Sequence, residues 1–236
     1  MCSSDLEASA KDLGERVVEA GPDQPLVDRN ARAGRHVMHP PTLDVLAHDR
    51  AHRRVGRENV TITTKTTARQ APAVRTDLER FLRELDTDYL DIVLLHCQTN
   101  ANWPIEHRAA MDVLSEYKER GVIRAVGVSC HDFGAFCAAA DCDWVDVVLA
   151  RINYAGHAMD DTPDNVAPVI ARMALSGKGV YAMKVVGGGS ELTNDPRRAI
   201  HYSFAVDGVH AMVLGMMDEQ QVDENLDYLE EVFALA

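Results

Sequence analysis

The segment DTDYLDIVLLH, residues 86–96, decides the fold class of this chain. Its second half, residues 91–96, is a nearly unbroken apolar run, which is typical of a strand buried on both faces of a parallel sheet. The run ends at His96, so a polar ring stands at the point where a buried strand leaves the core. The segment therefore predicts one strand of an α/β fold, with a candidate functional group at its end.

Five further apolar runs of the same character flank this strand, at residues 60–65, 124–129, 146–152, 179–185 and 209–214. Amphipathic stretches typical of helices lie between them, at residues 74–85, 104–120 and 163–175. Regular alternation of strands and helices indicates parallel βαβ units with right-handed crossovers. Six units are compatible with an open doubly wound sheet or with most of an eight-stranded barrel.

Polar and glycine-rich residues follow the strand ends, where parallel α/β proteins collect their functional groups. The residues concerned are Lys65, His96, Ser129, Arg151, Asn153, Lys184, the glycine triplet 187–189 and Gly215. A lysine and a histidine that end successive apolar strands are unusual, because burying either charge is costly without a partner. A buried Arg151 likewise needs a carboxylate, such as Asp146 or Asp160. Together these strand ends predict a functional site.

Charge and hydropathy exclude two classes of partner. The 236 residues carry a formal net charge of −13, which argues against a nucleic-acid partner, since phosphate binding needs a basic face. No window approaches the roughly 20 consecutive apolar residues of a membrane span. No charged-then-apolar leader opens the chain. We therefore expect a cytoplasmic protein whose partners are small molecules.

The first 57 residues differ from the rest of the chain. They contain no Phe, Tyr or Trp and have no net charge, so all of the −13 lies in residues 58–236. We therefore divide the chain into an atypical N-terminal segment, residues 1–57, and a barrel domain, residues 58–236. The segment is either a wrongly framed stretch or a helical cover, with helices at residues 6–20 and 42–53.

Four motifs resemble the aldo/keto reductase family in their order and spacing. Residues 61–65 resemble the strand that carries the catalytic lysine, and residues 86–96 resemble the segment that leads to the catalytic histidine. Residues 121–129 resemble the next strand, which ends in a serine that contacts nicotinamide. Residues 215–226 resemble the closing element around the adenosine phosphate of the cofactor. The resemblance implies a (β/α)8 barrel of the TIM-barrel type.

The resemblance also implies hydride transfer between NAD(P)H and a carbonyl or alcohol substrate. His96 would orient the carbonyl, and Lys65 would lower the pKa of a tyrosine acid, since a nearby cation favours phenolate. The implied cofactor contacts are Ser129, Arg151, Asn153, Lys184, Gly187, Gly189, Gly215, Gln221, Glu224 and Asn225. The glycines would let the backbone approach a pyrophosphate.

The chain departs from the family pattern at the first two strands. The family's catalytic tetrad also uses an aspartate and a tyrosine from that region, and no tyrosine precedes Tyr89. Lys65 and His96 are therefore half of a tetrad. We expect little or no turnover, because a missing general acid costs a factor of about 10²–10⁴. Six βα units also make an incomplete barrel, whose open edges invite self-association.

The segment after the last strand bears on cofactor choice. NADPH-preferring members of the family place basic groups there, against the 2′-phosphate, but residues 199–236 contain no Lys or Arg and eight acids. A dianionic phosphate would be repelled unless Arg197 or Arg198 reaches it. The composition therefore favours NADH, or weak binding of either cofactor, over tight NADPH selectivity.

Three alternatives stay open. In the first, the chain is a non-catalytic barrel remnant that binds a nucleotide or a partner chain. In the second, it is a metal protein. Adjacent strands end in His96-Cys97 and Cys130-His131, and tetrahedral zinc accepts such ligands. Neighbouring residues on a strand point to opposite faces, however, which favours fortuitous clustering. If residues 1–57 are genuine, the stand-in general acid is one of their histidines, His39, His48 or His52.

Overall fold

The computed structural model describes residues 17–20 and 56–234, which are arranged around one parallel sheet. The strands are β1 (Val17–Ala20), β2 (Thr61–Thr66), β3 (Leu90–Gln98), β4 (Ile123–Cys130), β5 (Val147–Arg151), β6 (Gly179–Met183) and β7 (Ala211–Met212). The helices are α2 (Ala71–Glu84), α3 (Trp103–Glu106), α4 (Arg108–Glu119), α5 (Phe133–Asp141), α6 (Pro163–Leu175), α7 (Pro196–Ala205) and α8 (Glu219–Ala234). Two short 3-10 helices, η1 (Arg57–Asn59) and η2 (Glu191–Asn194), complete the order.

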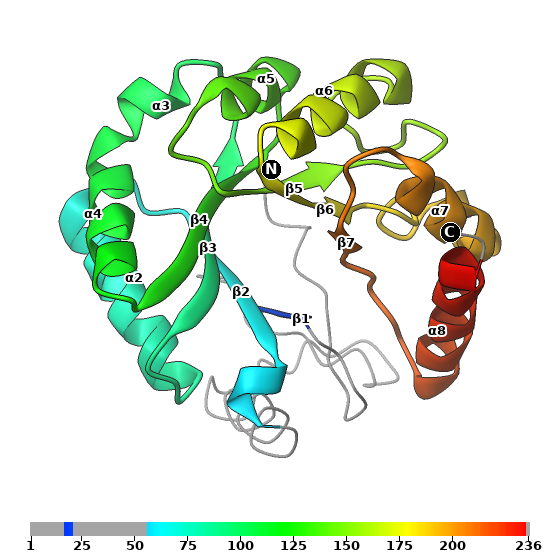
Figure 1. The fold of residues 1–236 in the computed structure, drawn as a ribbon, viewed down its shortest axis with the longest axis horizontal. Helices are drawn as coiled ribbons and strands as arrows, with labels where there is room; N and C mark the ends of the chain where they lie inside the picture. Colours follow the sequence, from blue (N-terminus) through cyan, green and yellow to red (C-terminus); the bar gives the residue numbers. More distant parts are fainter. Residues whose placement is uncertain (1–16, 21–55, 235–236) are drawn as a thin grey trace, which may run out of the picture.

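The sheet curls into an incomplete barrel, with the helices on its outer surface (Figure 1). The strand order is β1-β2-β3-β4-β5-β6-β7, and each neighbouring pair is parallel. Within the described residues, β1 and β7 each pair with one strand only, so the sheet has two edges. The predicted fold class, an incomplete (β/α)8 barrel with six βα units after residue 57, is confirmed.

The helices follow the prediction with one exception. α6 has the predicted bounds, and Pro163 stands at its first turn, where the missing N–H of proline is tolerated. The helix predicted at residues 104–120 is instead α3 and α4, divided at His107, where the backbone leaves helical geometry (φ −104°, ψ 19°). The His107 ring contacts Gln98 at the end of β3, and this contact turns the chain there. None of the helices described is long and apolar enough to cross a membrane.

Two strand regions differ from the prediction. β7 has two residues rather than the six predicted at 209–214, although His210 N and Val213 N still donate to carbonyls of β6 at 2.9 and 2.8 Å. The helix predicted at residues 6–20 is wrong for residues 17–20, which form β1, since two consecutive valines favour a strand. The other predictions for the N-terminal segment (helix 42–53, His39, His48 and His52) lie outside the described residues.

Residues along each strand alternate between the barrel interior and the face covered by helices. Leu94, Leu149, Tyr181 and Met183 form the inner apolar cluster, and a larger cluster packs between the sheet and the helices. Gly127 faces the interior beside Leu94, and a Cβ at this position would lie 1.8 Å from the carbonyl oxygen of β5 residue Val147. β4 and β5 therefore approach each other so closely that only glycine fits.

An ion-pair network closes the end of the barrel at which the strands begin. The Asp91 carboxylate accepts hydrogen bonds from Arg57 Nη2 and Arg124 Nη1, both at 2.7 Å. It also accepts the Ile62 N–H at 2.9 Å. The two guanidinium groups lie 3.8 and 4.1 Å from the centre of the Tyr89 ring, where they form cation–π contacts. Polar groups at this end of a (β/α)8 barrel serve stability rather than chemistry.

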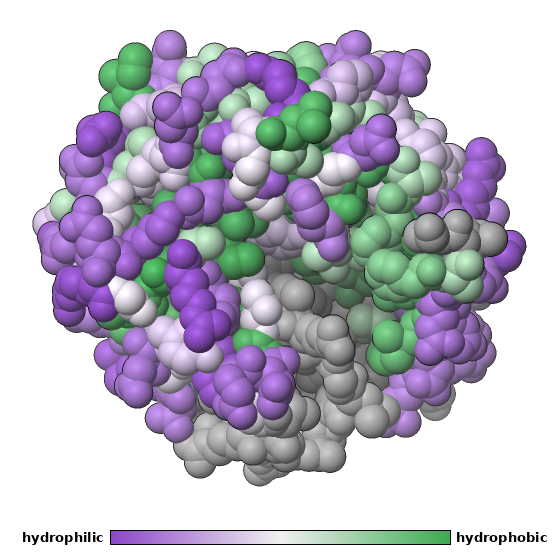
Figure 2. Space-filling view, viewed as in Figure 1, coloured by the Kyte–Doolittle hydropathy of each residue, from purple (hydrophilic) through white to green (hydrophobic). Residues whose placement is uncertain are grey.

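The outer surface is uneven in hydropathy. Apolar side chains gather over β7, α7 and α8, whereas α2 and α4 present a mainly hydrophilic surface in the same view (Figure 2). On α8, Leu226 and Phe233 are 53% and 66% exposed. The Phe233 ring also packs against Phe204 of α7, with 5.7 Å between the ring centres. Helix α8 is therefore held to α7 by apolar contacts and keeps part of its apolar surface exposed.

Candidate functional site

The ends of β2, β3 and β4 bring three predicted residues into the barrel interior. Lys65, His96 and Ser129 are buried, with 0%, 4% and 0% of their surface exposed. Lys65 pairs in register with Leu94, which lies two residues before His96. Residues two apart on a strand share a face, so Lys65 and His96 project from the same side of neighbouring strands. The two residues predicted to be catalytic are therefore neighbours on the inner face of the sheet.

His96 and Ser129 are in direct contact across β3 and β4. Ser129 Oγ lies 3.2 Å from His96 Nδ1 and accepts the Cys97 N–H at 3.0 Å. The register of the two strands shifts between Leu95 and Gln98, and Cys97 has a left-handed backbone with φ 59°. This β-bulge inserts one extra residue into β3 and directs the Cys97 N–H to the serine hydroxyl instead of the sheet ladder.

A second group of hydrogen bonds fixes the end of β3. Arg69 Nη2 donates to the His96 carbonyl oxygen at 2.5 Å. Gln98 Nε2 donates to the Leu95 and His96 carbonyls, which leaves Gln98 Oε1 to accept from His107 Nδ1 at 2.7 Å. Burial lowers the pKa of His107, and the Arg69 guanidinium lowers it further. Arg69, Gln98 and His107 were not predicted from the sequence, because their role depends on contacts between elements.

Arg151 ends β5 and forms a buried ion pair through Nη2 with Asp160 Oδ1. The side chains of Arg151 and Asp160 are 12% and 3% exposed. Of the two carboxylates predicted as partners of Arg151, Asp160 is the one that pairs with it, and Asp146 pairs with Lys118 instead. Burial raises the pKa of Asp160, against the opposing effect of the guanidinium. Within the described residues Arg151 Nε is buried without a hydrogen-bond partner. The guanidinium therefore has a donor left for a ligand.

Asn153 ties together the loops that follow β5 and β6. Its Nδ2 donates to the carbonyl oxygens of His157 and Lys184, at 2.7 and 3.0 Å. Its Oδ1 accepts the N–H groups of Ala155 and His157, at 3.1 and 3.0 Å. Both donors and both acceptor positions of the amide are therefore used by the backbone. Asn153 fixes the position of the Lys184 backbone, which has φ 58°.

The loop after β6 has three consecutive glycines with left-handed backbone. Gly187, Gly188 and Gly189 have φ values of 65°, 66° and 89°. A Cβ at Gly187 would lie 2.1 Å from Ser190 Oγ, and one at Gly188 would lie 3.2 Å from Lys184 Nζ. At Gly189 a Cβ would meet nothing within 4 Å. The loop presents exposed backbone beside a lysine ammonium, an arrangement that suits an anion.

The remaining predicted cofactor residues lie after β7; they are Gly215, which is exposed, and Gln221, Glu224 and Asn225 in the first half of α8. Gln221 Oε1 accepts the Met217 N–H at 2.8 Å, so this side chain shapes the turn before the helix. Asp218 Oδ1 accepts the Gln221 N–H at 2.9 Å and caps α8. A carboxylate therefore already stands at a helix N-terminus, where an anion would otherwise bind.

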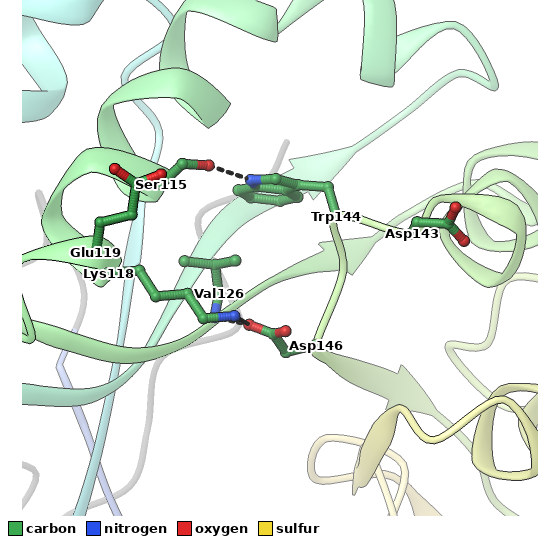
Figure 3. Close-up of a pocket in the computed structure, with 7 residues that line it drawn as sticks. All are labelled: Ser115, Lys118, Glu119, Val126, Asp143, Trp144 and Asp146. Atoms are coloured by element: carbon green, nitrogen blue, oxygen red, sulfur yellow. Dashed lines mark hydrogen bonds and ion pairs between the residues drawn. The ribbon is translucent and has the colours of Figure 1, made fainter.

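Two other features lie apart from this site. Within the part of the chain that the structure describes, no three His, Cys, Asp or Glu residues converge as metal ligands, so the zinc hypothesis gains no support there. A groove of about 410 Å³ lies on the outside, between α4 and the segment before β5 (Figure 3). Its Trp144 donates to Ser115 and its Lys118 to Asp146, so these wall groups are paired with each other. The groove is at the end where β5 begins, opposite to the candidate site.

The family models give one match for this chain. The model described as the aldo/keto reductase family matches residues 44–198, which is more than half of the chain. This range includes Lys65, His96, Ser129 and the loop after β6. No curated protein matches the chain.

Solved structures share the fold at low sequence identity. The holo form of an aldo-keto reductase from Bacillus halodurans has a TM-score of 0.66 and 20% identity, over 80% of this chain and 73% of that one. An aldo/keto reductase from Klebsiella pneumoniae, solved in complex with NADP and acetate, has a TM-score of 0.62 and 19% identity, over 79% and 71%. An aldose reductase from Giardia lamblia has a TM-score of 0.62 and 15% identity, over 92% and 79%. At such identities the likeness establishes the fold.

Proposed function

The chain belongs to the aldo/keto reductase family, and from this premise we propose that it is an oxidoreductase acting between a nicotinamide cofactor and the carbonyl or alcohol group of a small molecule. The observation that carries the proposal is the pair of buried residues Lys65 and His96 on one face of neighbouring strands. The cofactor, NADH or NADPH, supplies or accepts the hydride when it is bound. The NADP complex of the Klebsiella relative supports this choice of cofactor.

His96 and Lys65 act on the carbonyl oxygen in this proposal. His96 orients the oxygen by a hydrogen bond from its ring, and Lys65 places a positive charge beside the alkoxide that develops as hydride arrives. Both residues are nearly excluded from water, and electrostatic interactions are stronger in such surroundings than in solvent. Their fixed positions on a rigid sheet also avoid the cost of reorganising solvent during the reaction.

The strand ends fit a nicotinamide dinucleotide in three places. The unpartnered Nε of Arg151 suits an amide oxygen, which is what the nicotinamide carboxamide offers. Lys184 and the exposed backbone at Gly188 and Gly189 suit the pyrophosphate. Ser129, at the end of β4, lies on the strand next to that of Arg151, and Asn153 holds the loops that carry Arg151 and Lys184. Gly215, Gln221, Glu224 and Asn225 would meet the adenosine end.

The proposal includes weak turnover. No tyrosine precedes Tyr89 in the sequence, so the general acid that the family takes from its first two strands has no counterpart in that region. We expect carbonyl reduction to be slower by a factor of about 10²–10⁴ than with a complete tetrad. Robust carbonyl reduction by residues 1–236 alone would contradict this part of the proposal.

Cofactor binding tests the proposal without relying on turnover. Trp103 is buried just after β3, the strand that carries His96, and its ring centre lies 6.4 Å from that of Trp144, so these two indoles are the reporters. Titration with NADH and with NADPH is expected to quench their fluorescence saturably. Gly189→Ala is expected to weaken binding, because it puts a methyl group on the backbone that would meet the pyrophosphate.

Gly177→Ala is the matched control for Gly189→Ala. Both glycines have left-handed backbone, with φ 85° and 89°, and both have open space around the missing Cβ. The two substitutions therefore carry a similar conformational cost, but Gly177 follows α6 at the opposite end of the barrel. Equal loss of binding in both variants, or no binding by the folded chain, would contradict the proposal. The second result would leave the non-catalytic remnant as the better hypothesis.

The remaining parts of the proposal concern partners and organisation. We propose a small-molecule carbonyl substrate, no nucleic acid partner and a cytoplasmic location. We also propose that residues 58–236 are the barrel domain and that residues 1–57 are an atypical N-terminal segment. Deletion of residues 1–57 tests this boundary. It removes β1 and Arg57, and a barrel domain that folds from residue 58 without them should still unfold cooperatively in urea.

A further inference from the structure

We propose that Ser129 is a positioning residue that keeps His96 in one tautomer, the neutral imidazole with its hydrogen on Nε2. The direction of the hydrogen bond between the two side chains follows from the partners of the serine hydroxyl. The catalytic meaning of the tautomer rests on the proposed function, but the tautomer itself can be measured without any activity.

A serine hydroxyl has one hydrogen to donate and two lone pairs that accept. Ser129 Oγ accepts the Cys97 N–H at 3.0 Å, which occupies one lone pair. Its other partner within the described residues is His96 Nδ1 at 3.2 Å. Ser129 is completely buried, so water does not offer the hydroxyl hydrogen a further acceptor.

Two directions are possible for the contact between Ser129 and His96. If His96 Nδ1 carried a hydrogen, Oγ would accept twice and its own buried hydrogen would have no acceptor. Leaving a buried donor unsatisfied costs its full desolvation penalty. If Oγ–H donates to a bare Nδ1, both groups are satisfied. The second direction is therefore the stable one, and it places the ring hydrogen of neutral His96 on Nε2.

The bulge at Cys97 gives the serine hydroxyl its second partner. In a regular β3 the Cys97 N–H would be used in the ladder, and His96 Nδ1 would be the one partner of Ser129 Oγ among the described residues. The shifted register and the left-handed backbone of Cys97 give that N–H to the serine instead. A non-glycine residue in this conformation is strained, and such strain is concentrated at functional sites.

The tautomer decides what His96 contributes to the reaction. A neutral imidazole with hydrogen on Nε2 donates a hydrogen bond from the ring atom farthest from the backbone, which is the atom that can reach a carbonyl oxygen. His96 therefore orients and polarises the carbonyl and does not itself supply the proton. The proton that completes carbonyl reduction comes from another acid or from water.

The test is nitrogen NMR of the full chain with ¹⁵N-labelled histidine, recorded at about pH 8, above the usual histidine pKa. His96 is expected to show a protonated Nε2 and an unprotonated Nδ1 that is shifted by an accepted hydrogen bond. Ser129→Ala is expected to remove that shift or to move the hydrogen to Nδ1. Ser129→Thr, which keeps a hydroxyl, is expected to restore the wild-type pattern.

Two internal controls separate this effect from general disturbance. Ser203→Ala removes another completely buried serine hydroxyl, on α7, and should leave the His96 signals unchanged. The His210 ring accepts the Val180 N–H through Nδ1 at 3.1 Å, so its bare Nδ1 is a reference within each spectrum. Unchanged His210 signals in the Ser129→Ala variant would show that the fold persists.

Two NMR results would overturn the proposal. The first is a hydrogen on Nδ1 of His96 in the wild-type chain, and this measurement needs no variant. The second is an unchanged Nδ1 signal in Ser129→Ala with intact His210 signals. Where the chain reduces a carbonyl, Ser129→Ala should lower kcat/KM by about 10–100-fold, as is usual for a residue that orients a catalytic group. Absence of cofactor binding would count against the proposed function and leave the NMR test of the tautomer in force.

Discussion

Asp91 is the residue on which the closed end of the barrel depends most. Its carboxylate joins β2, β3 and β4 through bonds to Ile62, Arg57 and Arg124, and its side chain is 9% exposed. Asp91→Asn removes the negative charge, so the guanidinium groups of Arg57 and Arg124 lose their anionic partner. Hydrogen bonds to charged groups contribute about 1.5–3 kcal/mol, so we expect a loss of about 2–3 kcal/mol in the free energy of unfolding. Urea denaturation measures this loss.

Asp112→Asn is the matched control for Asp91→Asn. Asp112 also pairs with an arginine at 2.7 Å, but the side chains of Arg108 and Asp112 are 73% and 59% exposed. Exposed pairs contribute little, so the expected loss is below about 0.5 kcal/mol. Similar losses of unfolding free energy in the two variants would show that the burial of the Asp91 network does not add to its contribution to stability.

Individual site residues were predictable from the sequence only where they stand at the end of an apolar strand. Lys65, His96, Ser129 and Arg151 follow apolar runs, and the structure places all four at strand ends. The contact of His96 with Ser129 was not predictable, because it depends on a bulge at Cys97. No glycine marks that left-handed position in the sequence, and a bulge at another residue type leaves no local signal.

At the level of elements, we propose that helix α8 influences the choice between NADH and NADPH. Asp218 caps the helix and Glu219 begins it, so two acids lie where the resemblance places the adenosine phosphate. Glu219→Lys replaces a repulsion with an attraction and leaves the cap intact. We expect the affinity for NADPH relative to NADH to rise about 2–5-fold, the range of exposed ion pairs. Fluorescence titration of both cofactors measures the ratio.

Glu230→Lys is the control for Glu219→Lys, since it makes the same charge change three turns along α8. It should leave the ratio of the two affinities unchanged. An equal change in both variants would show an effect of net charge alone, and no change in either would place the 2′-phosphate elsewhere.

The junction of β3 with α4 makes stability depend on pH. Burial first and Arg69 second lower the pKa of His107, which donates through Nδ1 to Gln98. Below its usual pKa near 6.5, the unfolded chain therefore binds more protons at His107 than the folded chain does. The free energy of unfolding should accordingly rise as the pH rises toward the usual histidine pKa.

His107→Gln should reduce this slope, because glutamine does not titrate. His157→Gln is the control, since His157 is an exposed histidine in the loop after β5. Urea denaturation at several pH values between about 5 and 7 gives the slopes. The explanation fails if His107→Gln retains the wild-type slope or if His157→Gln removes it.

Helices and strands were predictable from the sequence where a single local signal determined their bounds. α6 begins at Pro163 and keeps an amphipathic pattern, and its bounds agree with the prediction. Residues 104–120 keep a continuous helical pattern, so the break at His107 was missed, because its cause is a ring contact with β3. β1 was missed because four residues with two valines are too short to stand out from a segment without aromatic residues.

At the scale of the whole molecule, the two sheet edges invite association. β1 and β7 each have one partner strand within the described residues, and unpaired strand edges are templates for pairing with another chain. We expect sedimentation velocity to show a species larger than the monomer whose share grows with protein concentration. A monomer at every concentration, including the highest soluble one, would contradict self-association through these edges.

Strand order that follows chain order has a consequence for synthesis. From β2 onward each strand pairs with the next, and successive strands start roughly 30 residues apart, as in a single βαβ unit. Each closure therefore spans a short and nearly constant length of chain, and short closures cost little entropy. A polypeptide emerging from the ribosome can add one strand at a time to an existing edge. Once residue 130 has emerged, the nascent chain already contains both sides of the contact between His96 and Ser129.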